Sequence, residues 1–281
     1  MALITETKKS FAIATRRVDP GINVDVKGYV DPLERNFSPL VPLDQVRNDF
    51  SHGAGGEFTG DPPKIAATHS SAALVVNVFG PWRTQPLALK LNGQQGFHTL
   101  RFEERCPIVS HGMPPHLDLI AESESDVVAV ESKCTEYLKP KSASFKDAYE
   151  KYWDDRPSCS WREAMVLLKK QPDRFSFLDA AQLIKHYMGL RRRYESGTGT
   201  PYRDGKIVLL YLYWEPTNAG QFDAFVSHRA EIKAFGAEVG DDIVEFKSLT
   251  YAELWDSWDS SSDPLAKKHV EWLRSRYEFT I

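Results

Sequence analysis

Apolar and polar side chains alternate along the middle of the chain in a way that predicts strands. Residues 97–104 alternate well, and the runs 116–121 and 126–134 are also strand-like, which together predict a three-strand meander. Before it lies the apolar run 72–79, preceded by the helix-capping residues Ser70 and Ser71 and followed by a Gly-Pro stop. This run predicts a short buried helix, although its valines leave a strand open.

After the meander the hydrophobic period becomes helical. Residues 161–193 predict two helices separated at Pro172, and the apolar run 206–214 predicts a buried strand. The remaining expected elements are a helix, a strand and two further helices, over residues 223–239, 243–249, 251–258 and 265–277. This order predicts an α/β fold, a three-layer sandwich with a central mixed sheet.

The first part of the chain shows no sustained period. Residues 1–63 are rich in Pro, Gly and Asn and are expected to form an irregular N-terminal wrap. Residues 64–281 are expected to form the main domain. The chain has 281 residues and is 42% hydrophobic, which is enough for a sizeable core.

Composition restricts the partners that can be expected. The longest apolar runs are much shorter than the roughly 20 residues of a membrane-spanning helix, and no secretory signal is visible, so a cytoplasmic protein without a membrane partner is expected. The three cysteines show no zinc-binding spacing. The net charge of −4 offers no general attraction to nucleic acid, so a local basic patch would be needed. The densest candidate is residues 185–193, although surface solubility explains these charges equally well.

Candidate chemistry begins with an acidic residue two positions before a lysine. This spacing occurs at Glu6/Lys8, Asp25/Lys27, Glu131/Lys133, Asp204/Lys206, Glu231/Lys233 and Glu245/Lys247. Two of these pairs, those of Glu131 and Glu245, lie on predicted strands, where residues i and i+2 share a face. The first two pairs lie in the N-terminal wrap, Asp204 lies in an expected turn, and on the helix of Glu231 such residues point apart.

The preceding strand distinguishes Glu131 from Glu245. If the predicted strands 116–121 and 126–134 form a hairpin that turns at Glu124-Ser125, Asp118 lies directly opposite Glu131, with Cβ atoms roughly 5 Å apart. No such acid faces Glu245. The alternative is that Asp118, Glu131 and Lys133 are merely solvated charges on a half-exposed strand. The apolar residues 127–130 argue against it, because they indicate a central strand buried on both faces.

These residues resemble a known family. The segment Pro114–Ile120 followed by Val127–Lys133 is similar to the signature of PD-(D/E)XK, restriction-endonuclease-like nucleases, and the predicted elements resemble their αβββαβ core over about 70–249. The resemblance implies that Asp118 and Glu131 bind Mg²⁺, which Mn²⁺ could replace, and that the Ser132 carbonyl completes the shell. Lys133 would serve the attacking water.

Two departures accompany the resemblance. First, Leu117 rather than proline precedes Asp118, a tolerable difference because the proline takes no part in the reaction. Second, the predicted first helix lacks the glutamate that many members have. Glu57 is the candidate replacement as a metal ligand. On the helix after the catalytic strand, Gln182 and Lys185 lie one turn apart, where related nucleases often place a catalytic Gln or Lys. A solvated helix face explains these two residues equally well.

The expected function is therefore a metal-dependent nuclease acting on nucleic acid, with DNA as the expected substrate. A homodimer would also be compatible. One alternative is a catalytically silent module of the same fold that binds nucleic acid or protein. Another is an α/β enzyme acting on nucleotides or small molecules, although no phosphate-binding loop is present.

Overall fold

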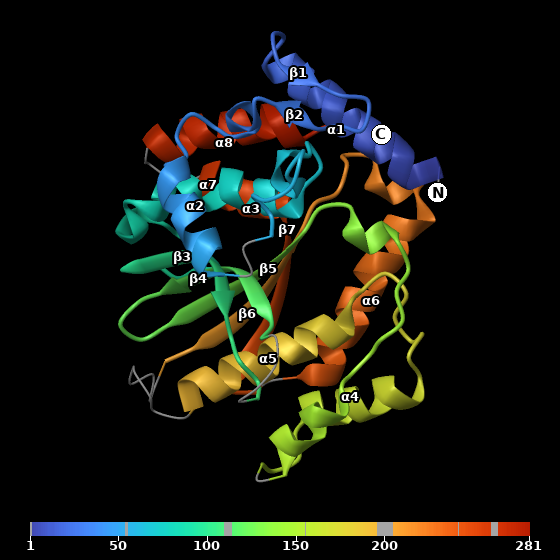
Figure 1. The fold of residues 1–281 in the computed structure, drawn as a ribbon. Coiled ribbons are helices and arrows are strands. Elements are labelled where there is room, and N and C mark those ends of the chain that lie inside the picture. Colours follow the sequence, from blue (N-terminus) through green and yellow to red (C-terminus); the bar gives the residue numbers. More distant parts are fainter. Residues whose placement is uncertain are drawn as a thin grey trace.

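A five-stranded sheet forms the centre of the protein (Figure 1). The computed structural model describes residues 2–53, 56–109, 114–154, 156–195, 205–240, 242–259 and 264–281. The sheet has the order β3-β4-β5-β6-β7, and its strands are β3 (Thr99–Arg105), β4 (His116–Glu122), β5 (Val127–Lys133), β6 (Ile207–Tyr213) and β7 (Val244–Thr250).

The sheet is mixed because its two halves are connected differently. Strands β3, β4 and β5 form an antiparallel meander, whereas β5, β6 and β7 are parallel. Parallel neighbours require long crossovers. The crossovers here carry helices: α4 (Ser160–Lys170) and α5 (Ala180–Glu195) lie between β5 and β6, and α6 (Asp223–Val239) lies between β6 and β7.

Helices cover both faces of the sheet, so the fold is a three-layer sandwich. One face is covered by α3 (Ser71–Phe79), α7 (Tyr251–Asp259) and α8 (Pro264–Tyr277), and the other by α4, α5 and α6 (Figure 1). Successive side chains of β5 pack alternately into the hydrophobic cores on the two faces of the sheet. Val128 and Val130 belong to the α3-side core, whereas Val127 and Ala129 belong to the α5-side core. The predicted central strand is confirmed.

The predicted elements after residue 64 are confirmed with small differences at their ends. Residues 72–79 form a helix rather than a strand. The Ser70 hydroxyl accepts a hydrogen bond from the Ala73 amide at 3.1 Å, which caps the helix and satisfies an otherwise unpaired donor.

The prediction that residues 1–63 are irregular was wrong, because this segment contains regular secondary structure. This segment contains α1 (Ala2–Val18), a two-stranded hairpin of β1 (Asn23–Val24) and β2 (Val30–Asp31), and α2 (Leu43–His52). The buried face of α1 includes Thr7 and Thr15, whose hydroxyls donate to backbone carbonyls four residues earlier. Because these threonines count as polar in a hydrophobicity pattern, the helical period was hidden.

Helix α1 packs against α8 at the rim of the α3-side layer (Figure 1). Phe11 of α1 contacts the rings of Trp214 and Phe279, with centroids 4.4 and 5.0 Å apart. The start of the chain is thereby anchored to its end. Among the helices in the described ranges, none has the length and apolar character that crossing a membrane would demand.

Candidate functional site

The predicted register of the β4–β5 hairpin is confirmed. Leu119 pairs with Val130 and Ile120 with Ala129, as the predicted turn requires, and the paired residues end there, one position short of Asp118 and Glu131. Asp118 and β5 are joined directly, because the Ser132 amide donates to Asp118 Oδ2 at 2.6 Å. The backbone therefore places Asp118 beside the Glu131-Ser132-Lys133 segment.

Along a regular strand, successive side chains point to opposite faces of the sheet. This alternation is interrupted at Asp118 on β4 and at Glu103 on the neighbouring strand β3. Leu117 and Ile120 both belong to the α5-side core although they lie three residues apart. Glu103 has φ +52°, a left-handed conformation that is uncommon for a non-glycine residue, and it is omitted from the β3–β4 pairs. Gly53 makes room for it, since a Cβ at residue 53 would lie 2.6 Å from the Glu103 Cβ.

On the α5 side of the sheet, Glu131 and Lys133 form a buried ion pair. Lys133 Nζ lies 2.5 Å from Glu131 Oε1 and donates to Gln182 Oε1 of α5 at 2.9 Å. His186 Nε2, one helical turn after Gln182, lies 2.8 Å from Glu131 Oε2. Of the two α5 residues considered from the sequence, Gln182 contacts Lys133, whereas Lys185 lies over the Phe145 ring and His186 is the second α5 side chain at this cluster.

The charges in this cluster stabilise one another. Burial alone would raise the pKa of Glu131, but the positive charge of Lys133, together with His186, lowers this pKa to about 2. Burial would lower the pKa of Lys133, but Glu131 and Asp118 outweigh that effect and raise it. Both groups are therefore ionised at neutral pH.

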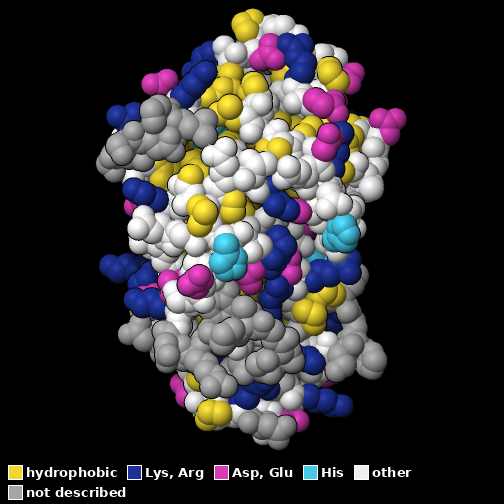
Figure 2. Space-filling view, turned by 90° about the vertical axis from the view of Figure 1, so that its left-hand side faces the viewer, with side chains coloured by type: hydrophobic (Ala, Val, Ile, Leu, Met, Phe, Trp, Pro, Cys, Tyr) yellow, Lys and Arg dark blue, Asp and Glu magenta, His cyan; other side chains and the backbone are white. Residues whose placement is uncertain are grey.

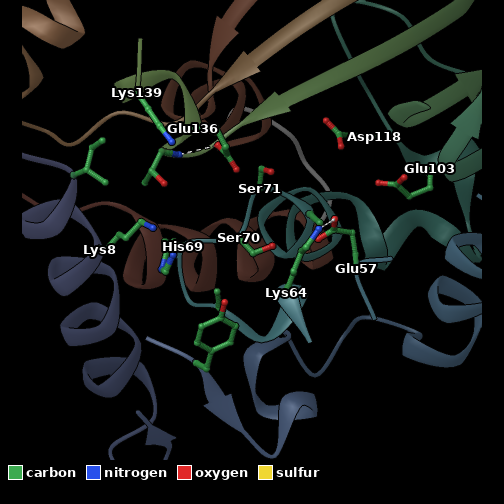
Figure 3. A pocket seen from close by; sticks show the side chains of 15 residues that line it. Lys8, Glu57, Lys64, His69, Ser70, Ser71, Glu103, Asp118, Glu136 and Lys139 are labelled. Carbon is green, nitrogen blue, oxygen red and sulfur yellow. Dashed lines mark hydrogen bonds and ion pairs between the residues drawn. The ribbon is translucent and has the colours of Figure 1, made fainter. Parts of the chain in front are cut away.

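Asp118 lines a pocket of about 490 Å³ beside the N-terminus of α3. Glu57 and Glu103 line the same pocket, and Figure 3 shows the three carboxylates around one end of it. Burial, then the charges of Glu131 and Glu103, raises the pKa of Asp118 well above its usual value. Burial, then Glu57 and Glu131, raises the pKa of Glu103 to about 7. Four carboxylates thus influence one another here.

Glu131 and Asp118 differ in their immediate surroundings. Glu131 does not line this pocket, because its carboxylate is held by Lys133 and His186 on the α5 side. Ser132, between Glu131 and Lys133 in the chain, is buried, and its hydroxyl lies 2.7 Å from the Tyr251 hydroxyl. The convergence of Asp118, Glu131 and the Ser132 carbonyl on one ion stays a prediction.

The donor chemistry nevertheless fits a hard divalent cation. Carboxylate and carbonyl oxygens are the ligands that Mg²⁺ prefers, and Mg²⁺ often uses only one or two carboxylates. Within the described ranges, no group of three or more His, Cys, Asp or Glu side chains forms a ready-made metal cage. Burial, followed by the neighbouring carboxylates, raises the pKa values of Asp118 and Glu103, and a bound cation would favour the ionised form of both.

The basic run 185–193 does not line the pocket. Lys185 lies over the Phe145 ring, Arg191 donates to the Tyr187 hydroxyl, and Arg193 pairs with Glu104. These three side chains are engaged with neighbouring residues, whereas His186 of the same run contacts Glu131, so whether the run neutralises phosphates stays a prediction. On the face seen in Figure 2, positive and negative side chains are interspersed rather than gathered into one basic patch.

Sequence reasoning missed Glu103 and the position of His186. The Glu103-Glu104 doublet interrupts the alternation of β3, and this was the available signal for an irregular strand. His186 follows Gln182 by four residues on a helix, so both had to share a face. Asp204, one of the acidic residues considered at the outset, lies outside the described residues.

The mixed sheet, the αβββαβ order and the strand-borne Asp118, Glu131 and Lys133 define a restriction-endonuclease-like protein. Comparison with protein families agrees with this class. The family described as Restriction Endonuclease associating with ARP matches residues 8–278, and the chain belongs to it. Comparisons with curated proteins and with solved structures gave no match.

Proposed function

We propose that this protein is a metal-dependent nuclease that hydrolyses phosphodiester bonds in nucleic acid, with DNA as its substrate. Asp118, Glu131 and the Ser132 carbonyl would hold Mg²⁺ or Mn²⁺, and Glu57 lies close enough to the pocket to assist. The bound cation would neutralise the negative charge that builds on the phosphoryl oxygens.

The residues of the protein supply the remaining requirements. Lys133 is protonated, so its ammonium group would hold the attacking water and stabilise developing charge rather than accept a proton. Gln182 orients Lys133 through their 2.9 Å hydrogen bond. His186 holds Glu131 from the other side, so that each charged group has a fixed partner.

One observation carries the proposal: a charged pair is buried at the end of a central strand, beside a second acid on the neighbouring strand. Glu131 and Lys133 side chains are 3% and 15% exposed, and Asp118 accepts a hydrogen bond from the residue between them. Burying such charges is costly, and a purely structural role could be filled by apolar residues. Membership of a restriction-endonuclease-associated family supports the same reading.

The direct test is cleavage of supercoiled plasmid and of single-stranded oligonucleotides with Mg²⁺, with Mn²⁺ and with EDTA. Wild-type protein is expected to cut with either metal and not with EDTA. Asp118→Asn should abolish cutting, whereas Glu245→Gln, which alters an acid on β7, should cut like the wild type.

A catalytically silent module is the outcome that would contradict this proposal. Wild-type protein would then bind nucleic acid without cutting any substrate under any metal condition. Cutting by Asp118→Asn at the wild-type rate would instead contradict the assignment of the site.

A further inference from the structure

The pocket beside α3 has two chemically different ends. Figure 3 shows Asp118, Glu103 and Glu57 with Lys64 at one end, Lys8, His69 and Lys139 with Glu136 at the other, and Ser70 and Ser71 between them. Its volume of about 490 Å³ lies within the usual range of ligand sites. A ligand in this pocket would therefore meet acids at one end and cations at the other.

The two lysines at the cationic end are available to a ligand. Neither Lys8 of α1 nor Lys139, after β5, forms an ion pair with a carboxylate of the described residues, whereas Lys64, at the acidic end, lies 3.9 Å from Glu57. The nearby Glu136 is engaged elsewhere, because its Oε2 accepts from the amides of Cys134 and Thr135 at 2.8 and 3.0 Å. Within the described residues, this end thus carries two lysines without an ion pair and one carboxylate, Glu136, that is already hydrogen-bonded to the backbone.

His69 adds an uncharged ring to the lining of this end. Burial, with the positive charge of Lys8, lowers the pKa of His69 to about 4, so its ring is uncharged at neutral pH. Its Nδ1 is buried and has no hydrogen-bond partner among the described residues. Because this atom is buried against Gly28, it is not exposed to the pocket, and the ring contributes to the pocket wall rather than to the charge of this end.

The N-terminus of α3 completes the wall between the two ends. Ser70 caps the Ala73 amide, while the amides of Ser71 and Ala72 donate to no acceptor within the described part of the chain. Free amides in the first turn of a helix favour an anion, and the lysines favour the same charge. Two independent features therefore select a negatively charged group.

We propose that this cationic end binds a phosphate of the substrate strand, close to the phosphate that is cut at the acidic end. This inference rests on the proposed nuclease function and names the part of the substrate that the second end holds. Phosphate matches the site because its oxygens can accept from two ammonium groups and from helix amides together. Helix α1 would then take part in substrate binding through Lys8, and would not serve only as packing.

The experiment measures binding without cleavage. A fluorescent single-stranded oligonucleotide is titrated in EDTA over a range of salt concentrations, and its anisotropy gives the affinity. The test variant is Lys8→Gln with Lys139→Gln. The matched control is Lys9→Gln with Lys170→Gln, which removes the same charge from two exposed lysines outside the pocket.

The pocket variant is expected to bind roughly 10 to 100 times more weakly than the control, with a salt dependence reduced by about one to two phosphate contacts. Since Lys8 and Lys139 form no ion pair with any residue that the structure describes, thermal unfolding should be nearly unchanged. Equal affinity and equal salt dependence in the two double variants would overturn the inference.

Cleavage of the same oligonucleotide by wild-type protein with Mg²⁺ or Mn²⁺ separates this inference from the proposed function. If wild-type protein cuts and the two double variants bind alike, the nuclease stands and the phosphate site falls. If wild-type protein never cuts but the pocket variant alone loses binding, the phosphate site stands and the nuclease falls.

Discussion

Strands β5 and β7 carry the same arrangement of charges in different surroundings. Glu131 and Lys133 on β5, like Glu245 and Lys247 on β7, are two residues apart and form ion pairs of 2.5 Å. The side chains of the β5 pair are 3% and 15% exposed, and those of the β7 pair are 30% and 48% exposed. The spacing alone therefore produces an ion pair but does not produce a buried site.

The difference arises from the positions of the two strands in the sheet. Strand β5 is central and lies beside β4, which brings Asp118, whereas β7 is an edge strand whose Glu245 pairs with Val208. Helix α5 adds Gln182 and His186 to the β5 pair alone. The acidic residue and the lysine form a buried site only where neighbouring strands and helices add further side chains, as β4 and α5 do for Glu131 and Lys133.

Removal of the two lysines is expected to give the largest contrast. Lys133→Ala should slow cleavage by about 10² to 10⁴-fold, as expected when a group that holds the attacking water and stabilises developing charge is lost. Lys247→Ala should leave the rate close to that of wild type. Initial rates under saturating Mg²⁺ measure both effects, and equal rates for the two variants would refute the distinction between the strands.

Neutralising the two glutamates should separate them by metal affinity. Glu131→Gln replaces a carboxylate by an amide, a poorer ligand for a hard cation, and should raise the Mg²⁺ concentration for half-maximal cleavage by about 10 to 100-fold. Glu245→Gln should not change it. Calorimetric titration with Mg²⁺ gives a second measurement, and unchanged affinity in Glu131→Gln would show that this carboxylate is not a ligand.

The crowded carboxylates beside β5 should make the metal-free protein sensitive to pH. Because the pKa of Glu103 is raised to about 7, ionising it costs folding free energy. Stability from this group is present at low pH and is lost as pH rises from the unfolded pKa near 4.5 towards 7.

Glu103→Gln should therefore stabilise the metal-free protein at pH 8, by on the order of 1 to 3 kcal/mol. It should also flatten the loss of stability between pH 4.5 and 7. Denaturant unfolding in EDTA at several pH values measures both effects, and a less stable variant at pH 8 would contradict this account.

The smallest effect is expected at the β7 pair itself. A double-mutant cycle with Glu245→Gln and Lys247→Met should give a coupling of about 0.2 to 1 kcal/mol, which is typical of exposed ion pairs. The coupling should decrease further at high salt. A coupling above about 3 kcal/mol would mean that exposure does not distinguish the two pairs.

Local patterns were sufficient to predict most elements and the β4–β5 register. Hydrophobic period and turn residues act over a few positions, so strand β5, helix α3 and the pairing of Leu119 with Val130 could be predicted from the sequence. The same patterns selected Glu131 over Glu245, because the apolar run before Glu131 indicated a central strand. Helix α1 was missed because its buried threonines interrupted the pattern.

Tertiary structure alone decided which side chains surround the pocket. Glu57, Glu103 and Lys8 belong to three separate segments, and no period in the sequence relates them. The left-handed backbone at Glu103 depends on the space left by Gly53, a contact between residues fifty positions apart. Local sequence determines which elements form, whereas burial against distant segments determines the direction of each charged side chain and its partners.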